Sequence, residues 1–244
     1  MQDWRLQPAE DLDLSAGERL RSIRRETGLV GAAGRFLWWA AARGILRAGC
    51  SLTVRGGENL PLQPPFVMIS NHASHLDSPV LAAALPLGWC DRTFALAAGD
   101  TFFMSRATAA LATGMLNALP IWRGRTRPEH MELLRRRLVD RHSVFILFPE
   151  GTRSRNGALG PFKSGLGRLV AGTAVPVLPC HIAGAHGVLP PGRNLPRRGA
   201  ISLTLGKPLV FADTGNDREG WRKVTEDAER AVRGLAEGAA GATT

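Results

Sequence analysis

A histidine and an aspartate lie five positions apart in the segment NHASHLD, residues 71–77. The segment follows the apolar run PFVMIS and precedes a second apolar stretch, PVLAAALPLGW. On a regular helix, residues five positions apart point in directions about 140° apart, because each residue turns the helix by about 100°. His72 and Asp77 can therefore meet only if a loop folds the carboxylate onto the imidazole. Asp77, Ser78 and Pro79 would then open the next helix.

A His–Asp pair of this kind could act as a general base. The carboxylate would hold one ring nitrogen, fix the tautomer and stabilise the imidazolium, and the other nitrogen could then take a proton. This is the chemistry of a catalytic triad without a serine nucleophile. The alternative is a structural cap, in which Asp77 begins a helix beside an incidental histidine.

Two further polar clusters follow apolar runs. Arg123 and Arg125 come after ALPIW, and the sequence PEGTR, residues 149–153, comes after VFILF. Ligand-binding groups gather at the carboxyl ends of parallel strands, and arginine binds phosphate with a planar fork of donors. Together the three clusters predict a site with a base, an acid partner and several phosphate ligands.

Short β-rich runs alternate with helical patterns along most of the chain. This alternation predicts a single α/β domain with a central, largely parallel or mixed sheet flanked by helices. The predicted strands are 51–56, 65–70, 92–98, 143–149, 174–184 and 200–210, and the predicted helices lie near 78–85, 103–117, 127–141, 164–172 and 218–236. We expect the domain to span 51–236, with a flexible tail at 237–244.

Residues 1–50 predict an N-terminal helical appendage to this domain. The pattern is helical from residue 15 to about residue 48; a basic stretch, SAGERLRSIRRE, precedes adjacent tryptophans at 38 and 39. Arg35, Arg43 and Arg47 recur at intervals of eight and four residues and would form one polar stripe on an otherwise apolar helix. A basic helix that carries tryptophan is typical of a segment lying in a membrane interface. A helix packed on the core of the domain is the alternative.

Composition limits the class of protein. The 244 residues are 44% hydrophobic with a formal charge of +10, so a large core and an anionic partner are both expected. Cys50, Cys90 and Cys180 are too few and too widely spaced for a disulfide framework or a metal site. We see no signal peptide and no apolar stretch of the ~20 residues that span a bilayer. The expected location is the cytoplasmic side of the cell membrane, as a peripheral or monotopic protein.

With the segment FPEGTRS, the chain resembles the glycerolipid acyltransferases, the family of 1-acylglycerol-3-phosphate (lysophosphatidic acid) acyltransferase. NHASHLD resembles the family's N-H-x-S-x-x-D block, and FPEGTRS matches its third block almost letter for letter. LPIWRGR and VPVLPCHIAG resemble the second and fourth blocks more loosely. The four blocks keep the family's order from residue 71 to residue 184.

The resemblance implies transfer of a fatty acyl group from acyl-CoA or acyl carrier protein to the hydroxyl of a lysophospholipid at a membrane surface. His72, oriented by Asp77, would be the general base, and no metal, cofactor or covalent acyl-enzyme is expected. The implied substrate-binding residues are Arg123, Glu150, Gly151, Thr152, Arg153 and Lys163.

One stretch departs from the family pattern. Many members that accept a phosphate-bearing lipid have a lysine-containing segment before the second block, where this chain has LAAGDTFFMSR, with Gly99 and Asp100. The acceptor could therefore be 1-acylglycerol-3-phosphate, another lysolipid or a hydroxylated lipid. A non-catalytic basic module that binds lipid or nucleic acid is a further alternative, although no nucleic-acid motif is present, tyrosine is absent and aromatic residues make up only 6%.

Overall fold

The computed structural model describes residues 9–122, 127–193 and 195–241. Their centre is a seven-stranded sheet with the order β1-β7-β6-β2-β5-β3-β4. All neighbouring strands are parallel except β6 and β7, which are antiparallel. The predicted α/β domain with a largely parallel or mixed sheet is confirmed. The strands are β1 (Leu52–Arg55), β2 (Phe66–Ser70), β3 (Thr93–Ala98), β4 (Leu119–Ile121), β5 (Val144–Leu147), β6 (Val177–Ala183) and β7 (Ile201–Leu205).

Each of the six predicted strands contains an observed one, and β4 is the strand that the sequence pattern missed. The helical pattern at 103–117 contains α5, and the short helix α4 comes before it. Helix α9 continues past the predicted helix end at residue 236 into the expected tail. The helices are α1 (Ala16–Arg19), α2 (Leu29–Gly49), α3 (Asp77–Ala83), α4 (Gly99–Phe102), α5 (Arg106–Leu116), α6 (Pro128–Asp140), α7 (Gly165–Val170), α8 (Ala185–Val188) and α9 (Arg218–Gly241), with short 3-10 turns at Gly57–Asn59 and Leu87–Trp89.

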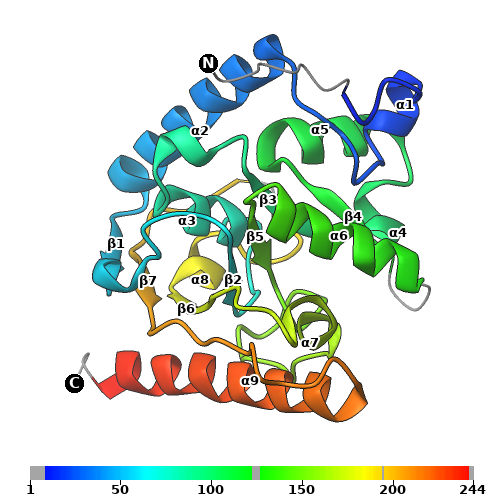
Figure 1. The fold of residues 1–244 in the computed structure, drawn as a ribbon. Helices are drawn as coiled ribbons and strands as arrows, with labels where there is room; N and C mark the ends of the chain where they lie inside the picture. The colour runs from blue at the N-terminus through cyan, green and yellow to red at the C-terminus, as the bar shows by residue number, and fades with distance from the viewer. Residues whose placement is uncertain (1–8, 123–126, 194, 242–244) are drawn as a thin grey trace, which may run out of the picture.

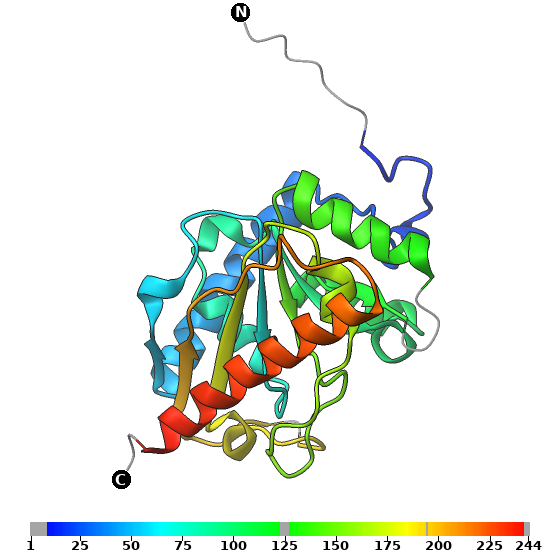
Figure 2. The same ribbon diagram turned by 60° about the horizontal axis from the view of Figure 1, so that its bottom comes forward.

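Helices cover both faces of the sheet (Figure 1). On one face, apolar residues of α6, α7 and α9 pack on the strands around Phe145. Figure 2 shows α9 lying across this face. On the other face, α2, α3 and α8 pack on the strands around Phe66 and Met68. The central strand β2 is buried at all five positions, which explains why its sequence is a continuous apolar run rather than an alternating one.

The described part of the N-terminal segment is packed against the domain. Ile23 belongs to the main hydrophobic core, and the buried Arg25 donates to Asn117 Oδ1 at 2.9 Å and to Ala118 O at 3.1 Å. Burial lowers the pKa of Arg25 to about 9. Arg137 in turn donates to the backbone oxygens of Ile23 and Arg25. These contacts join residues 9–27 to the domain that was predicted to begin at residue 51.

Two of the three arginines expected to form a polar stripe on α2 face the protein. Arg35 is buried and forms an ion pair with Asp91, and Arg43 donates to the backbone oxygen of Leu85. Burial lowers the pKa of both guanidinium groups. Trp39 is buried and Trp38 packs beside the same core, so both tryptophans face the domain. Arg35 and Arg43 are therefore held against the protein by acceptors from other elements, whereas Arg47 is exposed.

The outward side of α2 is apolar. Leu29 and Val30 are 91% and 89% exposed, and Leu37 and Ile45 are 67% and 63% exposed. We call these four residues the outer apolar face of α2. None of the helices in the described ranges is both long enough and apolar enough to cross a membrane.

Candidate active site

His72 and Asp77 are in contact where β2 ends. Nδ1 of His72 lies 2.9 Å from Oδ2 of Asp77, and the same oxygen accepts from the backbone N–H groups of Ala73 and Ser74 at 2.7 and 2.8 Å. Asp77 is the first residue of α3 and is buried. The loop thus folds the carboxylate onto the imidazole, as the spacing predicts.

The pair leaves one ring nitrogen available. A carboxylate oxygen accepts hydrogen bonds, so Nδ1 of His72 donates and the lone pair of the neutral ring lies on Nε2. The side chain of His72 is 21% exposed, whereas that of Asp77 is 1% exposed. The geometry therefore combines a buried, fixed carboxylate with an imidazole that reaches solvent.

The loop after β5 holds His72 from three sides. The ring of Phe148 stacks on the imidazole with centroids 4.0 Å apart, Glu150 Oε1 accepts from His72 N at 2.7 Å, and Ser154 N donates to His72 O at 2.7 Å. These contacts exist because β5 lies beside β2 in the sheet, so the loops that follow the two strands meet. Phe148 is the first residue of the segment FPEGTRS, but the sequence reasoning did not predict its contact with His72.

Both carboxylate oxygens of Glu150 accept hydrogen bonds from backbone N–H groups. Its second oxygen, Oε2, accepts from Gly160 N at 2.9 Å, and a Cβ at Gly160 would lie 2.9 Å from that oxygen. Burial raises the pKa of Glu150, and the hydrogen bonds from the backbone of Gly160 and His72 act in the opposite direction. Glu150 joins the loop that carries His72 to the loop that follows β5, and its predicted contact with substrate stays a prediction.

Asn71 attaches the same loop to β6, the other neighbouring strand, and Ser74 attaches it to Leu189, which follows α8. Asn71 Nδ2 donates to Ile182 O at 2.9 Å, and Ile182 N donates to Asn71 Oδ1 at 2.8 Å. Ser74 Oγ donates to Leu189 O at 2.7 Å. The loop is thus fixed by both neighbours of β2, which leaves His72 little freedom to move.

The predicted phosphate ligands divide into two groups. Arg153 lies beside the loop of His72, where its Nη1 contacts Nε2 of His75. Gly151 has φ of +70°, a left-handed conformation that favours glycine, and a Cβ there would lie 2.9 Å from Nζ of the exposed Lys163. Thr152 follows in the same turn and is exposed. Arg123, in contrast, lies outside the described residues.

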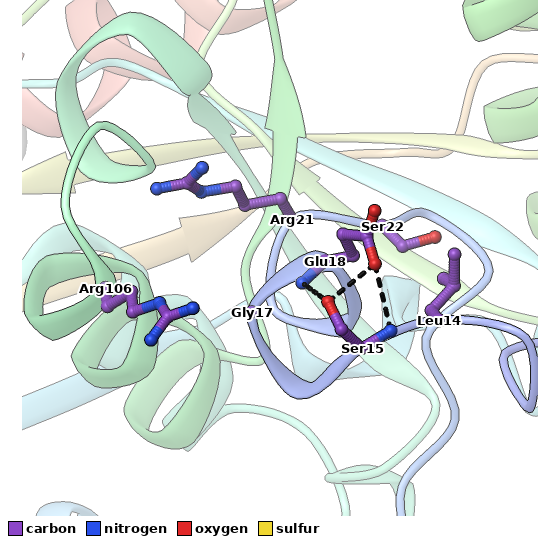
Figure 3. Close-up of a pocket in the computed structure, with 7 residues that line it drawn as sticks. All are labelled: Leu14, Ser15, Gly17, Glu18, Arg21, Ser22 and Arg106. Atoms are coloured by element: carbon purple, nitrogen blue, oxygen red, sulfur yellow. Dashed lines mark hydrogen bonds between the residues drawn. The ribbon is translucent and has the colours of Figure 1, made fainter.

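A surface hollow of about 450 Å³ lies apart from these residues (Figure 3). It is formed by the N-terminal segment and the first residue of α5, and none of the predicted site residues lines it. Arg21 and Arg106 project from its two sides, with Ser15 and Glu18 bonded to each other as a helix cap. The lining residues are Leu14, Ser15, Gly17, Glu18, Arg21, Ser22 and Arg106.

In the described part of the chain, no three His, Cys, Asp or Glu side chains are grouped so that they could hold a metal ion. The three cysteines are free and buried. The predictions of no metal and no cofactor stay predictions, and the residues at the sheet edge supply a base, a carboxylate and cations.

A family model described as "Acyltransferase" matches residues 51–183, which is more than half of the chain. The chain therefore belongs to the Acyltransferase family. Among curated proteins, it is 33% identical over 160 residues to "1-acyl-sn-glycerol-3-phosphate acyltransferase BAT2, chloroplastic" of Brassica napus, covering 64% of this chain and 44% of that protein. It is 32% identical over 133 residues to "1-acyl-sn-glycerol-3-phosphate acyltransferase alpha" of Mus musculus, covering 54% and 45%.

A solved structure is also similar. The crystal structure of the 1-acyl-sn-glycerophosphate (LPA) acyltransferase PlsC from Thermotoga maritima matches with a TM-score of 0.59 and 26% identity, covering 84% of this chain and 79% of that one. The two curated relatives, by comparison, are matched over less than half of their own length. The matched family region runs from β1 to the end of β6 and contains the His72 and Glu150 loops.

Proposed function

We propose that this protein is a lysophospholipid acyltransferase. It would transfer a fatty acyl group from acyl-CoA or acyl carrier protein to the free hydroxyl of 1-acylglycerol-3-phosphate and so form phosphatidic acid. The observation that carries this proposal is the contact between His72 Nδ1 and the buried Asp77, in a chain of the Acyltransferase family. The names of the relatives support the acceptor.

In this proposal His72 acts as general base. Its Nε2 takes the proton of the acceptor hydroxyl while the hydroxyl oxygen bonds to the carbonyl carbon of the donor thioester. The carbon–sulfur bond then breaks, and the sulfur takes the proton from His72 and leaves as a thiol. A positioned base contributes about 10²- to 10⁴-fold in rate, and the rest comes from orientation and electrostatics.

The cations beside the loop would bind the acceptor phosphate. Arg153 presents a guanidinium, whose donors match phosphate oxygens, and Lys163 adds a compact positive charge beside Gly151. Arg123, Thr152 and the backbone at Gly151 complete the predicted set. Glu150 would act by fixing the position of His72 N through its 2.7 Å hydrogen bond.

The test is thiol release from palmitoyl-CoA with a panel of lysophospholipids. Release with lysophosphatidate is the expected result and would make Asp100 an unimportant departure from the family pattern. Release with a different lysolipid alone would keep the reaction and change the acceptor. If thiol release fails with both palmitoyl-CoA and palmitoyl acyl carrier protein, the proposal is wrong and a binding module becomes the better hypothesis.

We also propose that the protein attaches to membranes through the outer apolar face of α2. Four apolar side chains on one helix are exposed there, while Arg35 and Arg43 are engaged inside the protein. Attachment would then depend mainly on apolar burial rather than on attraction of these arginines to anionic lipid. It would also place the enzyme where its acceptor lipid lies.

Point variants test this attachment better than deletion, because removing α2 would also remove Trp39 and Leu46 from the core. Leu37→Asp is expected to lower vesicle binding about 10-fold or more, since burying one leucine side chain contributes about 1.5–3 kcal/mol. Thermal stability should change little, because Leu37 is 67% exposed. The measurement is flotation with vesicles of neutral and of anionic lipid.

Arg47→Gln on the same helix is the matched control. Arg47 is exposed, and this substitution removes a positive charge without changing the outer apolar face of α2. It should float like the unchanged protein. Loss of binding in Arg47→Gln with normal binding in Leu37→Asp would show that charge, and not the apolar face, drives attachment.

A further inference from the structure

His75 occupies a position that the N-H-x-S-x-x-D pattern leaves open, and the sequence alone gave it no role. In the structure its Nε2 contacts Nη1 of Arg153, which lies 78 positions further along the chain. Within the described part of the chain, the Arg153 side chain forms its one hydrogen-bonding contact with His75. His75 is part of the loop that Asp77 and Glu150 hold in place through backbone N–H groups, and its exposed side chain extends from that loop to Arg153.

We propose that His75 is a positioning residue that holds the guanidinium of Arg153 in the orientation that binds the acceptor phosphate. This inference rests on the proposed function, in which Arg153 is a phosphate ligand. It assigns a role at the same site to a residue outside the His–Asp pair.

The chemistry of the contact fixes the state of the imidazole. Arginine has donors and no acceptor, so Nε2 of His75 must accept, and the ring must be neutral with its proton on Nδ1. The pKa of His75 is lowered mainly by burial, next by the positive charge of Arg153, and then by His72. Asp77 acts in the opposite direction and raises it. The lowered pKa favours the neutral ring that the contact requires.

A neutral partner has an advantage over a carboxylate at this position. Aspartate or glutamate would orient the guanidinium but would also cancel much of its charge before the phosphate arrived. The imidazole orients Arg153 and leaves its full positive charge for the ligand. Acid would end this arrangement, because protonated His75 cannot accept a hydrogen bond and adds a second cation beside Arg153.

The experiment compares His75→Ala and His75→Gln with the unchanged protein, using calorimetric binding of a short-chain lysophosphatidate at pH 7.5 alongside steady-state turnover. We expect His75→Ala to weaken binding and raise KM about 10-fold, which equals about 1.4 kcal/mol, with kcat at saturation unchanged. His75→Gln should restore most of the affinity, because its amide oxygen can accept near the position of Nε2. His142→Asn, a change at an exposed histidine that follows α6, is the control and should behave like the unchanged protein.

Binding is then repeated between pH 7.5 and 5.5. Protonation of the ligand phosphate, whose second pKa is near 6, weakens binding in every variant as the pH falls. Binding by the unchanged protein should weaken further than binding by His75→Gln. Protonation of His75 removes the acceptor at Nε2, whereas the glutamine amide does not titrate. Equal affinity and equal pH dependence in the unchanged protein, His75→Ala and His75→Gln would overturn the inference even if turnover is normal. The expected binding pattern without any turnover would uphold the inference and count against the proposed reaction.

Discussion

Replacement of His72 by alanine is expected to lower kcat by about 10²- to 10⁴-fold, because it removes the base that would take the hydroxyl proton. KM for lysophosphatidate should change little, since Arg153 and Lys163 remain in place. The measurement is steady-state thiol release with saturating acceptor, over a range of enzyme concentrations that can detect a loss of this size.

The fold should survive this substitution. The loop is fixed mainly by Asp77 and Asn71 and by the backbone groups of His72, which alanine keeps. The circular dichroism spectrum and the melting temperature should therefore stay close to those of the unchanged protein. Near-normal turnover in His72→Ala would rule out the general-base mechanism, and loss of turnover together with loss of the folded spectrum would require a milder change such as His72→Gln.

The fold class could be predicted because its signals are local. The apolar runs at β2 and β5 are too short for helices and too continuous for half-exposed strands, which indicates strands buried on both faces. β4 was missed because it has three residues and contains Pro120, so it carries neither the length nor the pattern of a strand. Its pairing with β3 is decided by the packing of the whole domain.

The orientation of α2 shows what a helical pattern cannot decide. The intervals of eight and four residues correctly place Arg35, Arg43 and Arg47 near one side, but they do not say which side faces the protein. That depends on acceptors elsewhere: Asp91 for Arg35, and the backbone oxygen of Leu85 for Arg43. Each acceptor is more than forty positions away from its arginine along the chain, so only the folded structure reveals the contact.

The contacts at the site also divide into local ones, which the sequence predicts, and long-range ones, which it does not. The contact between His72 and Asp77 is local, and the spacing together with the helix-start signal predicts it. The contacts of Phe148 and Glu150 with His72, and of Arg153 with His75, depend on β5 lying beside β2 in the sheet. No spacing rule gives that strand order, which explains why these contacts of Glu150 and His75 could not be predicted.

The second large effect is expected at Asp77, where Asp77→Asn should lower kcat by about 10²- to 10⁴-fold. Asparagine can still accept from Ala73 N and Ser74 N, because its amide oxygen can take the place of Oδ2. It has no negative charge to stabilise the imidazolium that forms when His72 takes the proton. Turnover is measured as for His72→Ala, and melting is followed in parallel.

Asp77→Ala separates the structural role of the carboxylate from its catalytic one. Alanine removes the acceptor for two backbone N–H groups in the loop, and each unsatisfied buried group costs about 1–3 kcal/mol. Asp77→Ala should therefore lose both stability and turnover, whereas Asp77→Asn should lose turnover and keep most of its stability. If Asp77→Asn keeps kcat within about threefold of the unchanged protein, Asp77 is a helix-opening residue alone, and the imidazole of His72 needs no carboxylate to act as a base.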